Sequence, residues 1–255
     1  MKISRILYGF AGLILVTLIW QVISTFGLIS TFIPSPADTF GKLFESLGTA
    51  EFWQDVWTTV QVAIGGFLLA LVAGVILGVL IATSPLTMRA TRVLLEFLKP
   101  IPPIVILPLV VLLLGPSTQM GIFLVFYGCV LTIIMQTAAG VFDVDPVAVA
   151  TARSFSMGRL EILWRVVLPS SLSYIGTAIR VSIPASLIIA VVAGLLGGGP
   201  GLGKSLLKAQ LNGSMMALFA YVIALGLLGL LFQAVSELVE RRILHWHPSY
   251  RAEQR

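Results

Sequence analysis

The chain has 255 residues, of which 58% are hydrophobic and only 11% are charged, and its mean hydropathy is +1.03. Because a soluble domain carries about a quarter charged residues, this composition excludes a soluble enzyme, a disulfide-rich secreted scaffold and a disordered regulator, and makes lipid the main solvent. The net charge of +5 does not indicate nucleic-acid binding, since the charged residues lie at the ends of apolar runs and form no basic stripe.

Six apolar segments are candidates to cross a membrane, for which about 20 residues are needed. Five are long runs, whereas the third in chain order is shorter and is interrupted by four prolines. The backbone groups freed by these prolines need partners from neighbouring helices or water, so we expect the third segment inside the bundle. The sequence thus predicts one all-α transmembrane domain over residues 1–255, with spans at 6–26, 58–82, 97–114, 119–142, 171–196 and 214–236.

Lysine and arginine residues set the expected orientation of these spans. If the N-terminus is cytoplasmic, the inner segments hold eleven of them and the outer segments only three, which is a positive-inside bias. Both termini are therefore expected in the cytoplasm. The first span is too long for the apolar core of a signal peptide and lacks a small-residue cleavage site, so we expect it to remain as a helix.

Two segments outside the spans are long enough to have a role of their own. Residues 33–57 form an amphipathic stretch rich in Phe and Trp, which we expect to lie along the outer interface. Residues 143–170 separate the fourth and fifth spans on the inner side and carry three of the inner arginines.

Residues 198–205 match G-x-x-x-x-G-K-S, the pattern of a loop that binds nucleotide phosphates through backbone N–H groups. The context does not fit, because the segment falls on the expected outer face and no strand ending in an acidic pair follows it to hold Mg²⁺. We interpret it as a glycine-rich turn before a short helix and expect no ATP binding by this chain.

The inner segment suggests a compact plug. It reads as a short helix of small residues, a glycine turn, and an amphipathic helix stopped by Leu168-Pro169, a form that fits a groove on a cytoplasmic partner. Helical spacing places Ala148, Ala152 and Phe155 on one face. Two arginines in the segment, at 153 and 159, are able to make bidentate contacts with carboxylates. The alternative is an ordinary basic loop that obeys the positive-inside rule.

This stretch resembles the EAA loop of permease subunits of binding-protein-dependent ABC transporters, which reads E-A-A-x-x-x-G, nine residues, and then I-x-L-P. Counted back from Leu168-Pro169, Ala150 stands at the Glu and Ser156 at the Gly of that pattern. We expect Gly158 to supply the turn instead. The resemblance implies an ATPase-coupling role for a set of residues in this loop, namely Ala150, Thr151, Ala152, Arg153, Phe155, Ser156, Met157, Gly158, Arg159, Leu168 and Pro169.

Further motifs, in matching order, resemble the nitrate/sulfonate/taurine branch of these permeases. They are Ile33–Pro36, Lys99–Pro102 with Ile106–Leu109 and Leu114-Gly115, the turn Gly201-Leu202-Gly203, and the tail Arg241–Pro248. The resemblance implies the fold of type I ABC importer permeases in a bacterial inner membrane, no cofactor and no catalysis by this chain. It also implies two cytoplasmic ABC ATPase subunits, an extracytoplasmic substrate-binding protein, and a homodimer that conducts a small, anionic solute.

Two basic residues within or near the spans are candidates for the solute pathway, because a charge near the centre of a spanning helix costs roughly 2.5–3.5 kcal/mol on insertion scales and usually has a role. Arg180 lies nine residues into the fifth span, one turn before Pro184, where a bend opens room for a cavity. The alternative for Arg180 is that it reaches the inner interface or pairs with Glu96. Lys99 lies nearer an interface and is the weaker candidate.

Other patterns have simpler interpretations. Gly74-x-x-x-Gly78 allows close approach of two helices, within the chain or between copies. His245 and His247 lack a third ligand, so packing around Trp246 is favoured over a metal site. No catalytic motif for an intramembrane enzyme is present. A secondary transporter driven by an ion gradient is the main alternative function, but it needs carboxylates near the midplane that five of the six spans lack.

Overall fold

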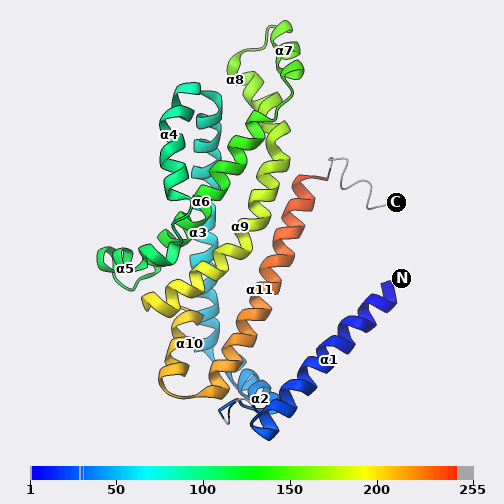
Figure 1. Ribbon diagram of the computed structural model, residues 1–255, viewed down its shortest axis with the longest axis vertical. Helices are drawn as coiled ribbons and strands as arrows, with labels where there is room; N and C mark the ends of the chain where they lie inside the picture. The colour runs from blue at the N-terminus through cyan, green and yellow to red at the C-terminus, as the bar shows by residue number, and fades with distance from the viewer. Residues whose placement is uncertain (1, 29, 31, 246–255) are drawn as a thin grey trace.

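The computed structural model describes residues 2–28, 30 and 32–245, and within these ranges its regular structure consists of helices. The helices are numbered in chain order, and a π-helical turn, η1, connects α8 to α9 (Figure 1). Their bounds are α1 Lys2–Phe26, α2 Pro36–Leu47, α3 Ala50–Thr83, α4 Pro85–Leu98, α5 Pro103–Leu114, α6 Thr118–Phe142, α7 Pro146–Ser154, α8 Arg159–Ile162, η1 Leu163–Val167, α9 Leu168–Gly197, α10 Leu202–Leu211 and α11 Met215–Ile243.

Five helical stretches of the described chain are long and apolar enough to cross a membrane. They are Leu7–Phe26 in α1, the whole of α3, α6 and α11, and the continuous stretch Arg159–Gly197. The α4–α5 pair gives a sixth if it counts as one span, although the two helices are bent by 92° relative to each other. The expected all-α membrane fold is confirmed.

Capping residues begin two helices here, and one of these helices starts earlier than expected. Thr49 caps α3, where its side chain accepts a hydrogen bond from the Phe52 N–H at 3.4 Å, so this helix begins at Ala50 and not at residue 58. The amphipathic segment expected at 33–57 is therefore α2 followed by the first turns of α3. Ser84 caps α4 in the same way, through the Thr87 N–H at 3.3 Å.

The third expected span, 97–114, is two helices. Pro100, Pro102 and Pro103 have no N–H to donate and disfavour helical geometry in the residue before each of them. The helix that begins at Pro85 consequently ends at Leu98, and a new helix starts only at Pro103.

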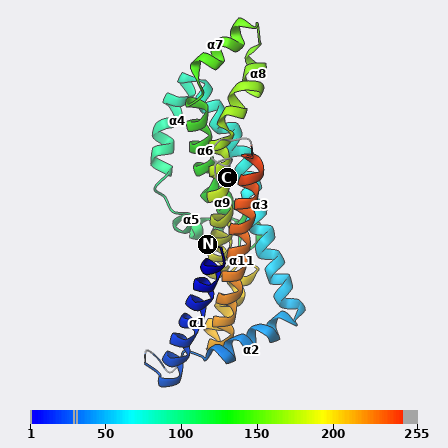
Figure 2. The same ribbon diagram turned by 90° about the vertical axis from the view of Figure 1, so that its right-hand side faces the viewer.

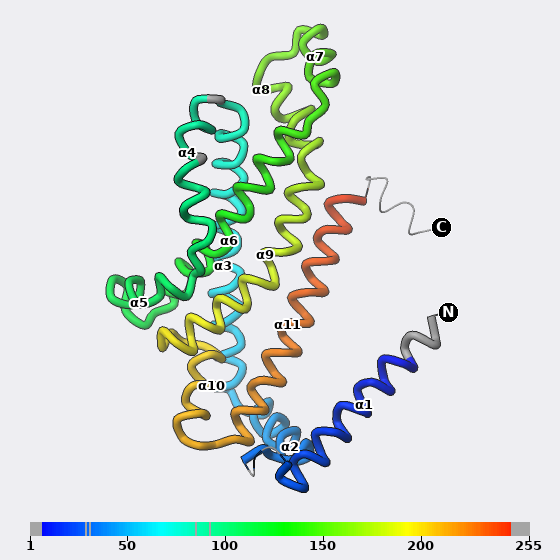
Figure 3. The backbone as a smooth tube through the Cα atoms, viewed as in Figure 1, coloured from blue at the N-terminus to red at the C-terminus, as the bar shows by residue number. Residues whose placement is uncertain are grey.

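The centre of the bundle is the close contact of α3 with α6, with α9 packed against both (Figures 1 and 3). Small residues at every fourth position of α3 face α6: Gly66, Ala70, Gly74 and Gly78. A Cβ added at the first of these would lie 2.7 Å from the Ile122 carbonyl oxygen, and one added at the last would lie 2.6 Å from Cβ of Thr137. The G-x-x-x-G pattern therefore serves contact within the chain.

The first helix stands apart from this bundle (Figures 1 and 2). No residue of its apolar stretch Leu7–Phe26 is buried within the described chain. Only its last turns are attached to the rest of the described chain. The Trp20 indole N–H donates to the Pro34 carbonyl at 3.1 Å, and the Trp20 ring stacks on that of Phe219 in α11, with 6.0 Å between the ring centroids. The outward face of α1 is thus left for lipid or another protein.

We predict that Gly66→Ala weakens the bundle by about 1–3 kcal/mol, because the new methyl group forces α3 away from the α6 backbone. The thermal midpoint of the protein in nanodiscs measures this effect. Gly229→Ala on α11 is the matched control, since a Cβ there meets nothing within 4 Å of the described chain, and it should leave the midpoint unchanged or raise it. Equal midpoints for the two variants would contradict the assigned contact.

Candidate functional site

The segment expected to contact a cytoplasmic partner projects from one end of the bundle, beyond the ends of α6 and α9 (Figures 1 and 2). Its first helix is started by Asp145, whose carboxylate accepts from the Val147 N–H at 2.8 Å, and by a proline at the first position. Its base is held by the Tyr174 hydroxyl, which donates to Asp143 at 2.9 Å. The segment is therefore anchored to α9 and ordered by its own local signals.

The turn that ends α7 is made by Ser156 and not by Gly158. Ser156 has a φ of 58°, the left-handed region, whereas Gly158 has a φ of −69° and caps α8. The Ser156 N–H donates to the Arg153 carbonyl at 2.9 Å, and the Met157 N–H donates to the Ala152 carbonyl at 3.2 Å. These two bonds are those of a Schellman cap, in which a glycine usually holds the left-handed position.

The end of α7 also separates residues that were expected to share a face. Ala152 is buried, whereas Phe155 has left the helix and exposes 79% of its surface. Other exposed apolar side chains of the segment are those of Val147, Leu160 and Trp164. Large exposed apolar side chains on a projecting segment are typical of a docking surface.

Arginines of the projecting segment are exposed in the described structure. Arg165 forms an ion pair with Glu161 at 3.2 Å within one helical face, while Arg153 and Arg159 extend from the two sides of the Ser156 turn. The basic side chains are thus available beside the exposed apolar ones, as the sequence suggested.

Leu168 and Pro169 do not stop the amphipathic helix as expected. Pro169 lacks an N–H and would crowd the carbonyl of Arg165 in a regular α-helix. The five residues Leu163–Val167 form a π-helical turn, in which the Leu168 N–H donates to the Leu163 carbonyl. This wider turn accommodates the proline, and the helix continues without interruption into α9.

The nucleotide-loop pattern at 198–205 is a packed turn. The Leu202 N–H, which would face a phosphate, donates to Thr59 Oγ1 at 2.9 Å, and the Ser205 hydroxyl donates to the Asp55 carboxylate. A Cβ at Gly203 would run into the Val191 carbonyl. Because these groups are already engaged and the backbones touch, the turn has no room for a phosphate, which supports the sequence interpretation.

Arg180, the stronger pathway candidate by sequence, lies against α11. Its Nη1 is 3.1 Å from Oε2 of Glu240, whose side chain is only 7% exposed, while the Arg180 side chain is 48% exposed. The partner is therefore Glu240 and not Glu96. Sequence reasoning missed Glu240 because nothing in the pattern of α11 indicates which face of it meets α9.

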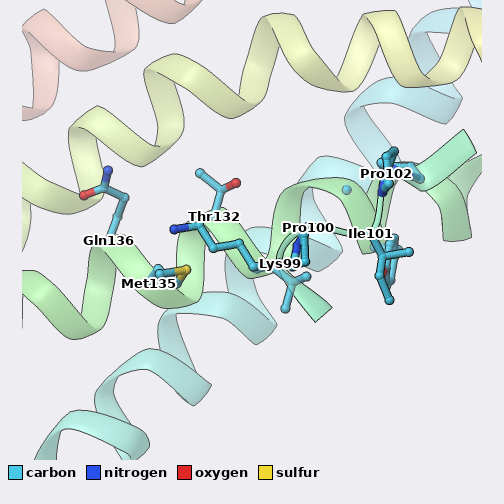
Figure 4. Close-up of a pocket in the computed structure, with 11 residues that line it drawn as sticks. Lys99, Pro100, Ile101, Pro102, Thr132, Met135 and Gln136 are labelled. Atoms are coloured by element: carbon cyan, nitrogen blue, oxygen red, sulfur yellow. The ribbon is translucent and has the colours of Figure 1, made fainter. Parts of the chain in front are cut away.

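Lys99, the weaker candidate by sequence, lines a cavity of about 400 Å³ at the break between α4 and α5. Figure 4 shows its side chain running along α6 toward Thr132 and Gln136. Tyr127, a turn and a half earlier on α6, also lines the cavity. The polar pair at 132 and 136 has helical spacing in an apolar run, which is a signal that sequence reasoning could have used.

We predict that Ser156→Gly slows amide exchange at Ser156 and Met157 by up to about fivefold, because glycine removes up to about 1 kcal/mol of left-handed strain. Hydrogen exchange with mass spectrometry on the reconstituted protein measures it. Ser154→Gly, inside α7, is the control and should speed exchange of the same peptide. Slower exchange in the control, or faster exchange in Ser156→Gly, would contradict the assigned turn.

We predict that Arg180→Met lowers the stability of the protein by about 1–3 kcal/mol, because it leaves the Glu240 carboxylate buried without its cation. The double variant Arg180→Met with Glu240→Met should recover most of the loss, as measured by thermal midpoints in nanodiscs. Wild-type stability of the single variant, combined with loss of solute uptake, would instead assign Arg180 to the pathway.

Solved structures with this fold are permeases of ABC importers. The inward-facing MetNI methionine ABC transporter aligns with a TM-score of 0.67 and 18% identity over 76% of this chain and 96% of that one. A bacterial ABC transporter that imports the acidic polysaccharide alginate aligns with a TM-score of 0.67 and 16% identity over 95% and 98% of the two chains. These likenesses show the type I importer fold.

Comparison with sequence relatives identifies the family to which this fold belongs here. The nitrate import permease protein NrtB of Leptolyngbya laminosa is 32% identical over 76% of this chain and 69% of its own length. The putative aliphatic sulfonates transport permease protein SsuC of Bacillus subtilis is 30% identical over 98% and 92%, and the taurine transport system permease protein TauC of Escherichia coli is 27% identical over 90% and 86%. Residues 70–245 match the family described as binding-protein-dependent transport system inner membrane component. The resemblance drawn from the sequence is confirmed, and the chain belongs to this family of ABC transporter permeases.

Proposed function

We propose that this chain forms the translocation pathway of an ATP-driven importer for a small, anionic solute of the sulfonate, nitrate, taurine or bicarbonate type. Relatives of similar length are named for the import of these solutes. Membership of the ABC permease family decides between the two functions left open by the sequence, in favour of ATP and against an ion gradient. The chain itself is non-catalytic, and two separate ABC ATPase subunits hydrolyse ATP.

The observation that carries the proposal is the projecting segment at 143–170. It presents Phe155, Leu160 and Trp164 beside two exposed arginines at one end of the bundle, a combination suited to a groove on an ATPase subunit. Because its second half continues through η1 into α9 as one helical stretch, a shift of the docked segment is passed directly into the bundle. The residues to which the resemblance gives a coupling role all fall within 143–170, and the proposal extends to them.

The same geometry supports an orientation in which this end faces the cytoplasm of a bacterial cell. Helix α1 runs toward α2, and α11 runs back from there toward the end that carries α7 and α8, so both termini are assigned to the cytoplasmic side (Figure 1). An extracytoplasmic binding protein would deliver the solute at the opposite end, where α2 and α10 lie.

A pair of identical copies completes the proposed pathway. One chain leaves the cavity at Lys99 open at its surface and leaves α1 without cover, so that a second copy is needed to enclose a route across the membrane. Residues 246–255, which include Trp246, His247 and Pro248 of the expected tail motif, lie outside the described residues.

The proposal is tested by copurifying the chain with the ATPase and binding protein encoded beside it and measuring ATP hydrolysis in nanodiscs. Hydrolysis that rises when the binding protein is loaded with taurine, methanesulfonate, nitrate or bicarbonate supports it. Absence of a copurifying ATPase, together with hydrolysis that is independent of this chain, would overturn it.

We predict that Phe155→Asp weakens retention of the ATPase subunits by at least about tenfold, because it places a charge where an apolar side chain enters a groove. Arg153→Glu should reduce stimulated hydrolysis in the same assay by reversing a contact charge. Leu211→Asp is the control, since Leu211 is equally exposed but lies on α10, at the other end of the bundle. Full retention of the ATPase by Phe155→Asp would remove the segment from the contact.

A further inference from the structure

The cavity at the α4–α5 break lies at the level of the middle of a spanning helix. Thr132, which lines it, is fourteen residues from the first residue of α6 and ten from its last, that is about 21 Å and 15 Å along the helix axis. Lys99 extends toward this residue (Figure 4). An ammonium group at this depth is costly in lipid, and such groups mark solute or ion pathways.

The neutral polar side chains that line the cavity with Lys99 all carry groups that can donate hydrogen bonds. Thr132 supplies a hydroxyl and Gln136 an amide, and Tyr127 supplies a phenol whose oxygen is buried and has no hydrogen-bond partner among the residues that the structure describes. A buried hydroxyl without a partner destabilises the empty protein, so a ligand that accepts a hydrogen bond from it would offset a cost already present.

The sign of the charge in the cavity is positive. Of the described residues that line it, Lys99 is the charged one and none is acidic; Glu96, one turn earlier on α4, is not part of the lining. The carboxyl end of α4 and the amino end of α5 meet here, so their partial charges oppose each other and leave the ammonium to set the field. Cations are therefore repelled and small anions attracted.

The backbone that carries Lys99 is held in place by its neighbours. The three prolines at 100, 102 and 103 hold the chain out of helical form directly after Lys99. Gly128 on α6 seats Pro103, since a Cβ there would lie 2.8 Å from the proline Cγ. This contact keeps the backbone after Lys99 at a constant place beside the residues of α6 that line the cavity, which suits a binding site.

We infer that this cavity is an oxyanion-binding site, in which Lys99 supplies the charge and Tyr127, Thr132 and Gln136 donate hydrogen bonds to a nitrate or sulfonate group in transit. The inference rests on the proposed function and adds to it a place and a ligand set. The remaining wall, which includes Ile101, Leu131 and Met135, is apolar and suits the short organic part of a sulfonate.

The test measures anion binding by the permease–ATPase complex in nanodiscs, without a binding protein. Sodium nitrate and sodium methanesulfonate are the probes, sodium chloride at equal ionic strength is the salt control, and dimethyl sulfone is the neutral counterpart. The thermal midpoint of the complex is recorded as a function of probe concentration. Both oxyanions should stabilise the wild type in a saturable manner beyond chloride, whereas the neutral probe should not.

Lys99→Met should raise the half-saturating concentration about tenfold or more, because it removes a charge-assisted hydrogen bond, while Lys99→Arg should retain most of the binding. Lys204→Gln, which removes an exposed lysine from α10, is the matched control and should bind as the wild type does. Tyr127→Phe has a distinctive signature. It should raise the midpoint without anion, since a buried unpartnered hydroxyl is gone, and weaken the anion-dependent gain severalfold.

Two results would overturn the inference: no saturable stabilisation of the wild type by either oxyanion, or the same half-saturation in Lys99→Met and the wild type. ATP hydrolysis by the same preparation separates this failure from failure of the proposed function. Hydrolysis stimulated by a loaded binding protein, without binding that depends on Lys99, rejects the site and retains the importer. If anion binding depends on Lys99 but ATP hydrolysis does not depend on this chain, the site is retained and the importer function is rejected.

Discussion

Backbone contact between α3 and α6 holds the remaining elements in place. Small residues at every fourth position of α3 leave little side-chain bulk on that face, so that side chains and carbonyls of α6 lie directly against the α3 backbone at its glycines. Lipid tails are as apolar as the helices, so helix association in a membrane depends on dispersion at short range and not on the hydrophobic effect. The other face of α6 receives α9, where Gly140 admits Tyr174, and the amino end of α5, where Gly128 admits Pro103.

Two basic side chains within this framework have different surroundings, and this difference supports the different roles proposed for them. Arg180 pairs with a nearly buried carboxylate on α11 and joins α9 to that helix, which offsets the cost of burying the Glu240 charge. Lys99 is held by a proline break at the edge of a polar cavity whose described lining is free of acidic residues. A paired cation contributes to the architecture, whereas a cation facing neutral donors has the chemistry of an anion site.

The proposed work of the protein links the projecting segment to the bundle through one continuous helical stretch, Arg159–Gly197. The π-helical turn at Leu163–Val167 accommodates Pro169, which would otherwise interrupt the helix. Because α8 and α9 form one helical stretch, we expect them to move together. At the other end of α9, Gly194 lies against Gly203 of the α10 turn, whose groups are bonded to the start of α3. Movement of the docked segment therefore acts on a helix whose far end is tied to the core.

The sequence by itself determined the all-α membrane fold, the turn at 198–205 and the family, because these follow from apolar run length, glycine and proline positions and motif order. It predicted a separate segment at 143–170 and assigned its turn to Gly158, because Ser156, although it stands at the glycine of the family pattern, is not a residue type that favours a left-handed φ of 58°. Only the tertiary structure decided that Arg180 pairs with Glu240, that the glycines of α3 contact α6, and that Lys99 lines one cavity with Tyr127, Thr132 and Gln136. Each of these depends on which faces of distant helices pack together, and helical periodicity gives the faces of one helix but not the partner that each face meets.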